Sequence, residues 1–418
     1  MVRTGGGMAG RADPLRMLAA GALAAGAVAG GAITARTARR MAAPKPPRPT
    51  PVRSVDPGGR TIVFGATPDA LLTGRYSFWF AEGRGHARVG AVLDHHGDAV
   101  VRELLGVDTG DIGAAREGRF NGWMYLTPDA FGLPYRSERV QTTQGAVPSW
   151  ILPGGDGTRW AVLVHGRSSV RQEALRAVPP LHAAGWSVLL PAYRGDGEAP
   201  QGDGSSRYAV PDGEWVDIES AILHALDEGA TEVVLVGWSS GASIVLTTAH
   251  RSRVRSVITG IVLDSPVLDG TSSLLARGDG MPTPVKHGAL SLLRSRVGGL
   301  LGGDDLDVDP GMTADPAELD VRALVLQSED DGVAPTEVTH AFAEARPDLV
   351  RLVPFVGARH TRLWNLDSAR WEGALTSWLA HDEAALDRLT GEAASTVRRA
   401  GPSRRAAGRR AAPPSPAT

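Results

Sequence analysis

The sequence predicts an α/β fold in which a mostly parallel central sheet carries helices on both faces. From about residue 147 onward, short apolar runs alternate with segments of helical periodicity. The apolar runs occupy residues 160–164, 186–190, 232–236, 257–263, 323–327 and 350–355. Runs that are apolar at nearly every position are typical of strands buried on both faces. Their regular alternation with helices favours parallel strands joined by helical connections.

The helices of this fold are expected at residues 168–184, 214–228, 240–250 and 366–380. In the second of these segments, Trp215, Ile218 and Ile222 recur on one face. That spacing is typical of a helix that packs on a sheet. Residues 270–318 interrupt the alternation with a leucine-rich helical pattern, and we expect them to form a short helical cap where a lid would lie.

The predicted domain organisation has four parts. They are an N-terminal tail at 1–52, a β-rich accessory region at 53–146, the α/β domain at 147–385 with its cap at about 270–318, and a basic, disordered tail at 386–418. In the accessory region, short runs such as Tyr76-Ser77-Phe78-Trp79-Phe80 are separated by Gly, Asp and Pro. This pattern indicates strands and turns rather than long helices.

The N-terminal tail contains a candidate membrane anchor. Residues 17–35 carry no charge, and these nineteen residues are just enough to span a bilayer as a helix. The flank after the segment is more basic than the flank before it, which favours a cytoplasmic location for the domain that follows. A cleaved signal peptide or a soluble extension is the alternative, and the protein would then be secreted or soluble in the cytoplasm. A proline-rich linker follows at 42–52.

Charge and composition exclude several classes of function. The chain has no cysteine, which excludes disulfides, thiolate metal sites and cysteine catalysis. Residues 1–53 hold nine Lys/Arg and one Asp, and residues 398–418 hold six Arg and no acid, so the body between them is acidic. An acidic body argues against nucleic-acid binding, whereas basic ends suit an anionic membrane surface. His95, His96 and Asp98 lack a further ligand at workable spacing, and we expect neither a metal nor a cofactor.

Residues 237–241 carry the most informative motif of the chain. They read Gly-Trp-Ser-Ser-Gly and lie between the apolar run 232–236 and the helix 240–250. A strand, a Gly-x-Ser-x-Gly turn and a helix together hold a serine hydroxyl above the carboxyl end of a sheet. The flanking residues are small because the backbone is crowded in so tight a turn. Ser239 is therefore the predicted nucleophile, and the alternative is a surface turn that happens to contain serine.

A serine nucleophile needs a base, and that base needs a carboxylate to orient it. For this type of turn the expected chain order is serine, acid, histidine. Asp331 follows the run 323–327 and is the predicted acid, with Asp330 and Glu329 as the fallbacks. His360 follows the last apolar run and is the predicted base.

Acyl transfer also needs hydrogen-bond donors aimed at the developing oxyanion. The predicted donors are the backbone N–H of Ser240, next to the nucleophile, and the backbone N–H of Arg167, which follows the run 160–164. His165 precedes Ser239 in the chain, against the expected order, so we predict a supporting role for it.

Residues 140–385 resemble the α/β-hydrolase superfamily, and within it the dienelactone-hydrolase-like and prolyl-oligopeptidase-like serine hydrolases. The resemblance implies a triad of Ser239, Asp331 and His360. It does not cover residues 1–140 or the C-terminal tail. The motifs that carry it are Val164-His165-Gly166, Ala192-Tyr193-Arg194-Gly195, Gly237-Trp238-Ser239-Ser240-Gly241, Asp331 with Pro335, and His360-Thr361.

The predicted function is that of a carboxylesterase-like serine hydrolase, which cleaves ester or related acyl bonds of a small-molecule substrate through an acyl-serine intermediate. The alternatives are an acyltransferase or a serine peptidase at the same site, and a catalytically silent binding protein of the same fold. Membrane contact is expected through residues 17–35 and their basic flanks. The sequence predicts neither the acyl chain nor the oligomeric state.

Overall fold

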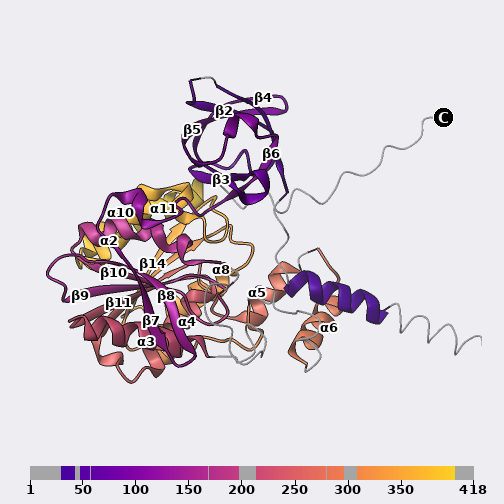
Figure 1. The fold of residues 1–418 in the computed structure, drawn as a ribbon. Helices are drawn as coiled ribbons and strands as arrows, with labels where there is room; N and C mark the ends of the chain where they lie inside the picture. Colours follow the sequence, from indigo (N-terminus) through magenta and orange to yellow (C-terminus); the bar gives the residue numbers. More distant parts are fainter. Residues whose placement is uncertain are drawn as a thin grey trace, which may run out of the picture.

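A computed structural model describes residues 30–42, 48–56, 58–167, 169–196, 213–278, 280–295 and 308–400, with side chains described to residue 391. Over these residues the chain forms a small β-barrel and a larger sheet covered by helices (Figure 1). Two further helices and a short N-terminal helix project from the sheet beside one another (Figure 1).

The larger sheet is mostly parallel, as predicted. Eight of the described strands build it in the order β14-β13-β12-β11-β9-β10-β8-β7. The strands from β14 to β10 pair in parallel, and β8 and β7 form an antiparallel hairpin at one edge. The strands are β7 (Arg136–Thr142), β8 (Gly145–Leu152), β9 (Arg159–Val164), β10 (Ser187–Pro191), β11 (Glu232–Trp238), β12 (Ile258–Asp264), β13 (Arg322–Ser328) and β14 (Val350–Phe355).

Helices cover both faces of this sheet. One face carries α3 (Glu214–Asp227), α4 (Ser240–Arg251) and α8 (Thr336–Ala345). The other face carries the 3₁₀-helix η4 (Arg171–Ala177), α2 (Val178–Ala183), α9 (Leu363–Leu366), α10 (Ser368–Leu379) and α11 (Glu383–Ala400). The two-sided cover explains why the strands are apolar at nearly every position.

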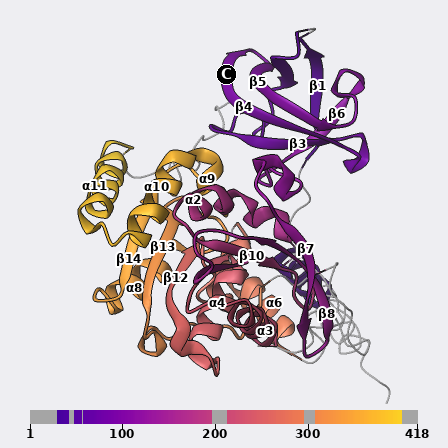
Figure 2. The ribbon, with the colours of Figure 1, turned by 60° about the vertical axis from the view of Figure 1, so that its left-hand side comes forward.

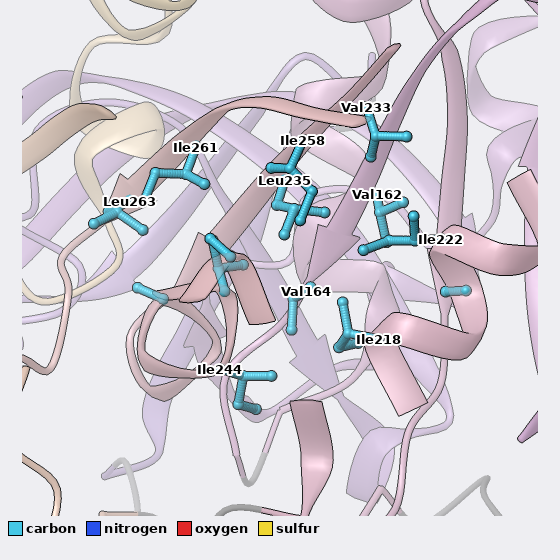
Figure 3. Close-up of a cluster of buried hydrophobic side chains, with 14 of the residues drawn as sticks. Val162, Val164, Ile218, Ile222, Val233, Leu235, Ile244, Ile258, Ile261 and Leu263 are labelled. Atoms are coloured by element: carbon cyan, nitrogen blue, oxygen red, sulfur yellow. The ribbon is translucent and has the colours of Figure 1, made fainter. Parts of the chain in front are cut away.

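Side-chain alternation lets each strand supply both cores. In β9, Val162 and Val164 point toward α3 and α4, whereas Ala161 and Leu163 pack on the opposite face. Figure 3 shows the first of these cores, in which Ile218 of α3 meets side chains of the parallel strands.

The β-rich accessory region is a closed barrel of six described strands in the order β1-β2-β5-β4-β3-β6. In β3, Tyr76, Phe78 and Phe80 alternate inward and form an aromatic core with Phe64 and Phe120. The strands are β1 (Thr50–Val55), β2 (Thr61–Gly65), β3 (Tyr76–Phe80), β4 (Gly85–His96), β5 (Ala99–Thr109) and β6 (Glu117–Asn121). The side of the barrel that carries β3 lies nearest the larger sheet (Figures 1 and 2).

The predicted cap contains two helices in its described part, α5 (Gly270–Arg277) and α6 (Thr283–Arg294). A helix over residues 30–42 packs against them through Ala38, Met41 and Ala42 (Figure 1). The Arg277 guanidinium also donates to the Met41 carbonyl, at 3.3 Å. The N-terminal segment is therefore part of the cap's packing.

Three predicted boundaries need correction. The boundary at 146/147 falls inside β8, because β7 and β8 pair with the larger sheet rather than with the barrel. The barrel begins at Thr50, inside the predicted linker. The tail predicted to be disordered from 386 continues as α11 to residue 400, with Leu386 buried against the sheet domain.

The candidate anchor lies only partly within the described residues. Residues 17–29 are outside them, and residues 30–35 begin the helix that packs on the cap. No helix in the described ranges is long and apolar enough to cross a bilayer.

Candidate active site

Ser239 lies in a strained turn between β11 and α4. Its backbone has φ 55° and ψ −120°, a conformation that L-residues rarely adopt and that costs energy. The surrounding glycines allow the turn to close. A Cβ atom on Gly237 would lie 2.6 Å from the Gly241 carbonyl oxygen, and one on Gly241 would lie 2.3 Å from the Val164 carbonyl oxygen. The Gly-x-Ser-x-Gly pattern is thus a steric requirement of this backbone.

We expect Gly241→Ala to destroy the turn. The added methyl group meets backbone atoms of β9, which cannot move without disrupting the sheet. Thermal melts and an activity assay should show a large loss of both stability and turnover. Gly373→Ala in α10 is the matched control, since a Cβ there meets nothing within 4 Å and alanine favours a helix by roughly 0.5–1 kcal/mol over glycine. If both variants melted like the wild type, the steric explanation would be wrong.

The structure brings the three predicted residues together. His360 Nε2 lies 2.8 Å from Ser239 Oγ, and His360 Nδ1 lies 2.8 Å from Asp331 Oδ2. The Asp331 side chain is fully buried, whereas 18% of the His360 side chain is exposed. An ionised carboxylate can only accept hydrogen bonds, so Nδ1 carries the proton and Nε2 is left to accept from the serine hydroxyl.

Asp331 is fixed by its own loop. Its Oδ1 accepts hydrogen bonds from the backbone N–H groups of Val333 and Ala334, at 2.8 and 2.9 Å. The two fallback acids point elsewhere: Asp330 accepts from the Gly357 N–H, and Glu329 contacts His340. Among the three candidates, Asp331 is the residue that meets His360.

The two predicted oxyanion donors belong to Ser240, the residue after the nucleophile, and to Arg167 in the loop that follows β9. Ser240 begins α4, where backbone N–H groups have no partner within the helix. The Arg167 N–H donates to Ser240 Oγ at 2.7 Å, so an oxyanion would have to replace that hydroxyl as the acceptor. Gly166 lies close to the nucleophile, since a Cβ on it would be 3.3 Å from Ser239 Cβ. The absence of a side chain at Gly166 keeps the space beside Ser239 open.

His165 is buried beneath this loop. Its Nε2 lies 3.1 Å from Asp196 Oδ2, and its ring stacks on Tyr193. Tyr193 in turn donates its hydroxyl to the His165 carbonyl at 2.7 Å. These contacts correspond to the supporting role predicted for His165.

A pocket opens beside Ser240, with a polar end and apolar walls. At the polar end, Arg167 pairs with Glu214, both nearly buried. Burial opposes the charge on Arg167, but Glu214 outweighs that effect and the pKa of Arg167 is raised. The walls come from Trp215, Ile244, Val267, Val308 and Met312.

A buried network holds the segment that follows His360. Thr361 has φ 54°, its N–H donates to Ser265 Oγ at 3.0 Å, and its carbonyl accepts from Arg176 Nη1 at 3.0 Å. The Ser265 hydroxyl donates to Asp264, whose other oxygen accepts from the Trp371 indole N–H. The strained Thr361 backbone is thus held on both sides.

Burial and the neighbouring guanidinium groups shift the pKa values of the acidic groups in this network. Complete burial raises the pKa of Asp264, an effect that Arg176 partly opposes. Burial also opposes the ionisation of Glu173, but Arg176 and Arg362 outweigh it and lower the pKa of Glu173. The buried guanidinium of Arg176 therefore compensates acidic groups on both sides of it.

One cluster among the described residues has the side chains for a metal ion. Glu138, His224 and Glu228 place their ligand atoms within 4.8 Å of one another. Arg136 already bonds both carboxylates, at 3.1 Å to Glu138 and 2.8 Å to Glu228. A cation would have to displace this guanidinium, and the cluster shares no residue with the site around Ser239.

Sequence reasoning missed the residues that support His360. Neither Ser265 nor Arg176 is predicted from the sequence as a residue of the site. The one available signal was the position of Asp264 and Ser265 at the end of the apolar run 257–263, on the same sheet edge as Ser239 and Asp331.

The comparisons with protein families match both the barrel and the domain built on the larger sheet. Residues 51–121, which correspond to the barrel, match a domain of unknown function (DUF8805). A search of curated proteins found no significant match.

Solved structures with a similar fold include esterases. An esterase from Pyrococcus furiosus has 16% identity and a TM-score of 0.47, over 62% of this chain and 94% of that one. A thermophilic esterase from Thermogutta terrifontis has 19% identity and a TM-score of 0.42, over 59% and 98%. The carboxylesterase CesB from Bacillus subtilis has 14% identity and a TM-score of 0.43, over 60% and 93%. Likenesses this distant carry no argument about substrates.

The comparison with protein-family models identifies the family of the larger domain, which the distant structural likenesses do not. Residues 161–415, more than half of the chain, match the model of the alpha/beta hydrolase family. The predicted superfamily is thereby confirmed, whereas the narrower resemblance to dienelactone-hydrolase-like and prolyl-oligopeptidase-like enzymes stays a prediction. The chain belongs to the alpha/beta hydrolase family and is a hydrolase.

Proposed function

We propose that this protein is a carboxylesterase-like serine hydrolase with Ser239 as nucleophile, His360 as general base and Asp331 as the orienting acid. The observation that carries the proposal is the continuous hydrogen-bonded chain from Ser239 Oγ through His360 to Asp331, with both joining distances at 2.8 Å. A nucleophile and a base within hydrogen-bond reach, with a third group orienting the base, are the geometric signature of covalent acyl transfer.

In the proposed reaction, Ser239 Oγ attacks the carbonyl carbon of an ester while His360 Nε2 takes the hydroxyl proton. The N–H groups of Arg167 and Ser240 stabilise the oxyanion. The carbon–oxygen bond to the leaving alcohol then breaks, and His360 returns the proton to that alcohol. His360 then deprotonates a water molecule, which attacks the carbonyl carbon of the acyl-serine. The bond between that carbon and Ser239 Oγ breaks, His360 returns the proton to Ser239 Oγ, and the acid is released.

We infer that the pocket beside Ser240 receives the acyl group. Its walls are largely apolar, and it begins at the residue next to the nucleophile. The charge of Arg167 is already paired with Glu214, and Asp309 also lines the pocket. We therefore expect neutral, apolar acyl chains rather than anionic ones.

A substrate panel tests this function. p-Nitrophenyl esters of increasing acyl length and the matching p-nitroanilides should be assayed on the purified full chain. Ester hydrolysis well above amide hydrolysis is the expected result. Preferential cleavage of the anilides would favour a peptidase, transfer to an added alcohol in place of hydrolysis would favour an acyltransferase, and inertness toward every ester would favour a silent binding protein.

We also propose that residues 17–35 attach the protein to a membrane, with the catalytic domain in the cytoplasm. Support comes from the uncharged segment and its basic flank in the sequence. In cell fractionation, the wild-type chain should sediment with membranes, and Leu18→Lys/Leu23→Lys should release it. Both substitutions precede the helix at 30–42, so the cap packing stays intact. Wild-type protein in the soluble fraction would exclude the anchor, and a mature chain outside the cell that starts near Arg36 would indicate a signal peptide.

A further inference from the structure

The barrel contacts the segment that contains His360. We call residues 359–365, which run into the short helix α9, the histidine loop, and residues 66–75, which connect β2 and β3, the barrel loop. At one end of the contact, the Arg359 guanidinium pairs with the Asp69 carboxylate and donates to the Pro68 carbonyl at 3.3 Å. Arg359 is the immediate neighbour of His360. The barrel therefore touches the histidine loop on the residue before the proposed base.

At the other end of the contact, the two backbones hydrogen-bond. The Arg75 N–H donates to the Asn365 carbonyl at 2.8 Å, and Asn365 Nδ2 donates to the Arg75 carbonyl at 2.9 Å and to the Gly122 carbonyl at 3.1 Å. Gly74 permits this approach, since a Cβ on it would lie 2.1 Å from the Asn365 carbonyl oxygen. The fit between the two loops is close enough to exclude one methyl group.

Asn365 connects the barrel to the backbone beside His360. It is almost completely buried, at 1% exposure, and its Nδ2 atom bonds the barrel while its Oδ1 accepts from Arg176 at 3.3 Å. Arg176 also donates to the Thr361 carbonyl. A single buried path thus joins barrel carbonyls, Asn365, Arg176 and Thr361, the residue after His360.

The barrel loop is itself rigidly held. Arg102 of β5 is fully buried and donates to the carbonyls of Ala70, Leu72 and Gly74, at 3.1, 2.7 and 2.6 Å. Burial lowers the pKa of Arg102 to about 10, which leaves it charged at neutral pH. Charge-assisted hydrogen bonds of this kind are stronger than neutral ones. Three carbonyls of the barrel loop are therefore fixed from inside the barrel.

We propose that the barrel is a positioning module for the active site: by clamping both ends of the histidine loop, it holds His360 at bonding distance from Ser239 and Asp331. The inference rests on the proposed function and gives a role to the domain at residues 51–121. Asn365 and Gly74 are its central positioning residues. The histidine loop contains the strained backbone of Thr361, and the barrel adds to the contacts that Ser265 and Arg176 make with that residue. Catalysis is sensitive to displacements of about 1 Å, which can cost on the order of 10²-fold in rate.

The test loosens the clamp from each side in the full-length chain. Asn365→Asp replaces the Nδ2 donor by an oxygen that faces two carbonyls, and Gly74→Ala adds the excluded methyl group. Gly97→Ala is the matched control: Gly97 is also a barrel glycine with positive φ, but a Cβ on it meets nothing within 4 Å. For the wild type and each variant, we would measure kcat and KM with an ester, the rate of fluorophosphonate labelling, and the melting temperature.

We expect both clamp variants to lose 10- to 100-fold in kcat and in labelling rate, with KM within about threefold of the wild type. Gly97→Ala should keep kcat within twofold. A merely stabilising barrel would lower the melting temperature of the clamp variants but leave kcat of the folded enzyme unchanged, and that result would overturn the proposal. If either variant fails to fold, Asp69→Asn carries the test. Its control is Asp98→Asn, which breaks an exposed Arg–Asp pair between two residues of the barrel domain. Equal kcat values for these two variants would likewise overturn the proposal.

These outcomes are separate from failure of the proposed function. A wild-type chain that neither hydrolyses esters nor reacts with the fluorophosphonate contradicts the serine hydrolase itself. An active wild type whose clamp variants are equally active contradicts only the role of the barrel.

Discussion

Ser239→Ala should abolish ester hydrolysis, with a loss in kcat on the order of 10⁴–10⁶. The hydroxyl is the only group in the proposed site that attacks the substrate, and its hydrogen-bond partner is His360 Nε2, at 2.8 Å. The strained backbone at φ 55° does not depend on the hydroxyl, because the fit of Gly237 and Gly241 determines the turn. The melting temperature should therefore stay close to that of the wild type.

The adjacent serine provides the control for this prediction. Ser240→Ala removes a hydroxyl one residue away, one that accepts from the Arg167 N–H and does not contact His360 in the structure. This variant should remain an active enzyme, with its rate altered only through the oxyanion donors. Residual turnover of more than a few per cent in Ser239→Ala, or a complete loss in Ser240→Ala alone, would mean that the nucleophile is wrongly assigned.

Asp331→Asn should lower kcat on the order of 10⁴ while the protein stays folded. The two backbone N–H groups of Val333 and Ala334 would keep the amide oxygen at the Oδ1 position. The amide nitrogen would then occupy the Oδ2 position, 2.8 Å from His360 Nδ1, and would donate to it. With Nδ1 as an acceptor, the proton moves to Nε2, and the imidazole can no longer accept the proton of Ser239.

Asp330→Asn is the matched control, since it makes the same chemical change at the preceding residue. The Asp330 carboxylate accepts from the Gly357 N–H and does not bond His360 in the structure, so kcat should change only a few-fold. Steady-state kinetics and a thermal melt on both variants test which of the two acids orients His360. Comparable rates for the two variants would exclude Asp331 as the orienting acid.

The larger sheet could be predicted because its strands carry their own signal. A parallel strand buried on both faces must be apolar at nearly every position, and β9, β11 and β13 read that way in the sequence. The antiparallel hairpin of β7 and β8 carries no such signal. Its assignment to the sheet depends on pairing with β10, a contact between segments nearly forty residues apart that composition does not encode.

Both ends of the chain were less predictable for a similar reason. The arginine-rich C-terminus suggested disorder from residue 386, yet Leu386 and Leu389 pack on the sheet domain and extend helical structure to residue 400. The proline-rich composition before Thr50 predicts a linker up to residue 52, whereas β1 begins at Thr50. In each case, a few apolar side chains that find a tertiary partner outweigh the composition around them.

The central residues of the candidate site were predictable, whereas their supports were not. Ser239 has a local motif, and Asp331 and His360 follow from chain order at strand ends. Arg176 and Asn365 act only through contacts between distant segments, at separations of 185 residues to Thr361 and 290 residues to Arg75. Residues that act by holding another residue in place leave no pattern of their own in a single sequence.

The most direct test of the proposed mechanism is covalent labelling of the full-length protein by a fluorophosphonate, followed by mapping of the modified residue by peptide mass spectrometry. The proposed mechanism predicts one phosphonyl group per chain, attached to Ser239, with labelling lost in Ser239→Ala and retained in Ser240→Ala. An unlabelled wild-type protein, or a label that persists in Ser239→Ala, would contradict it.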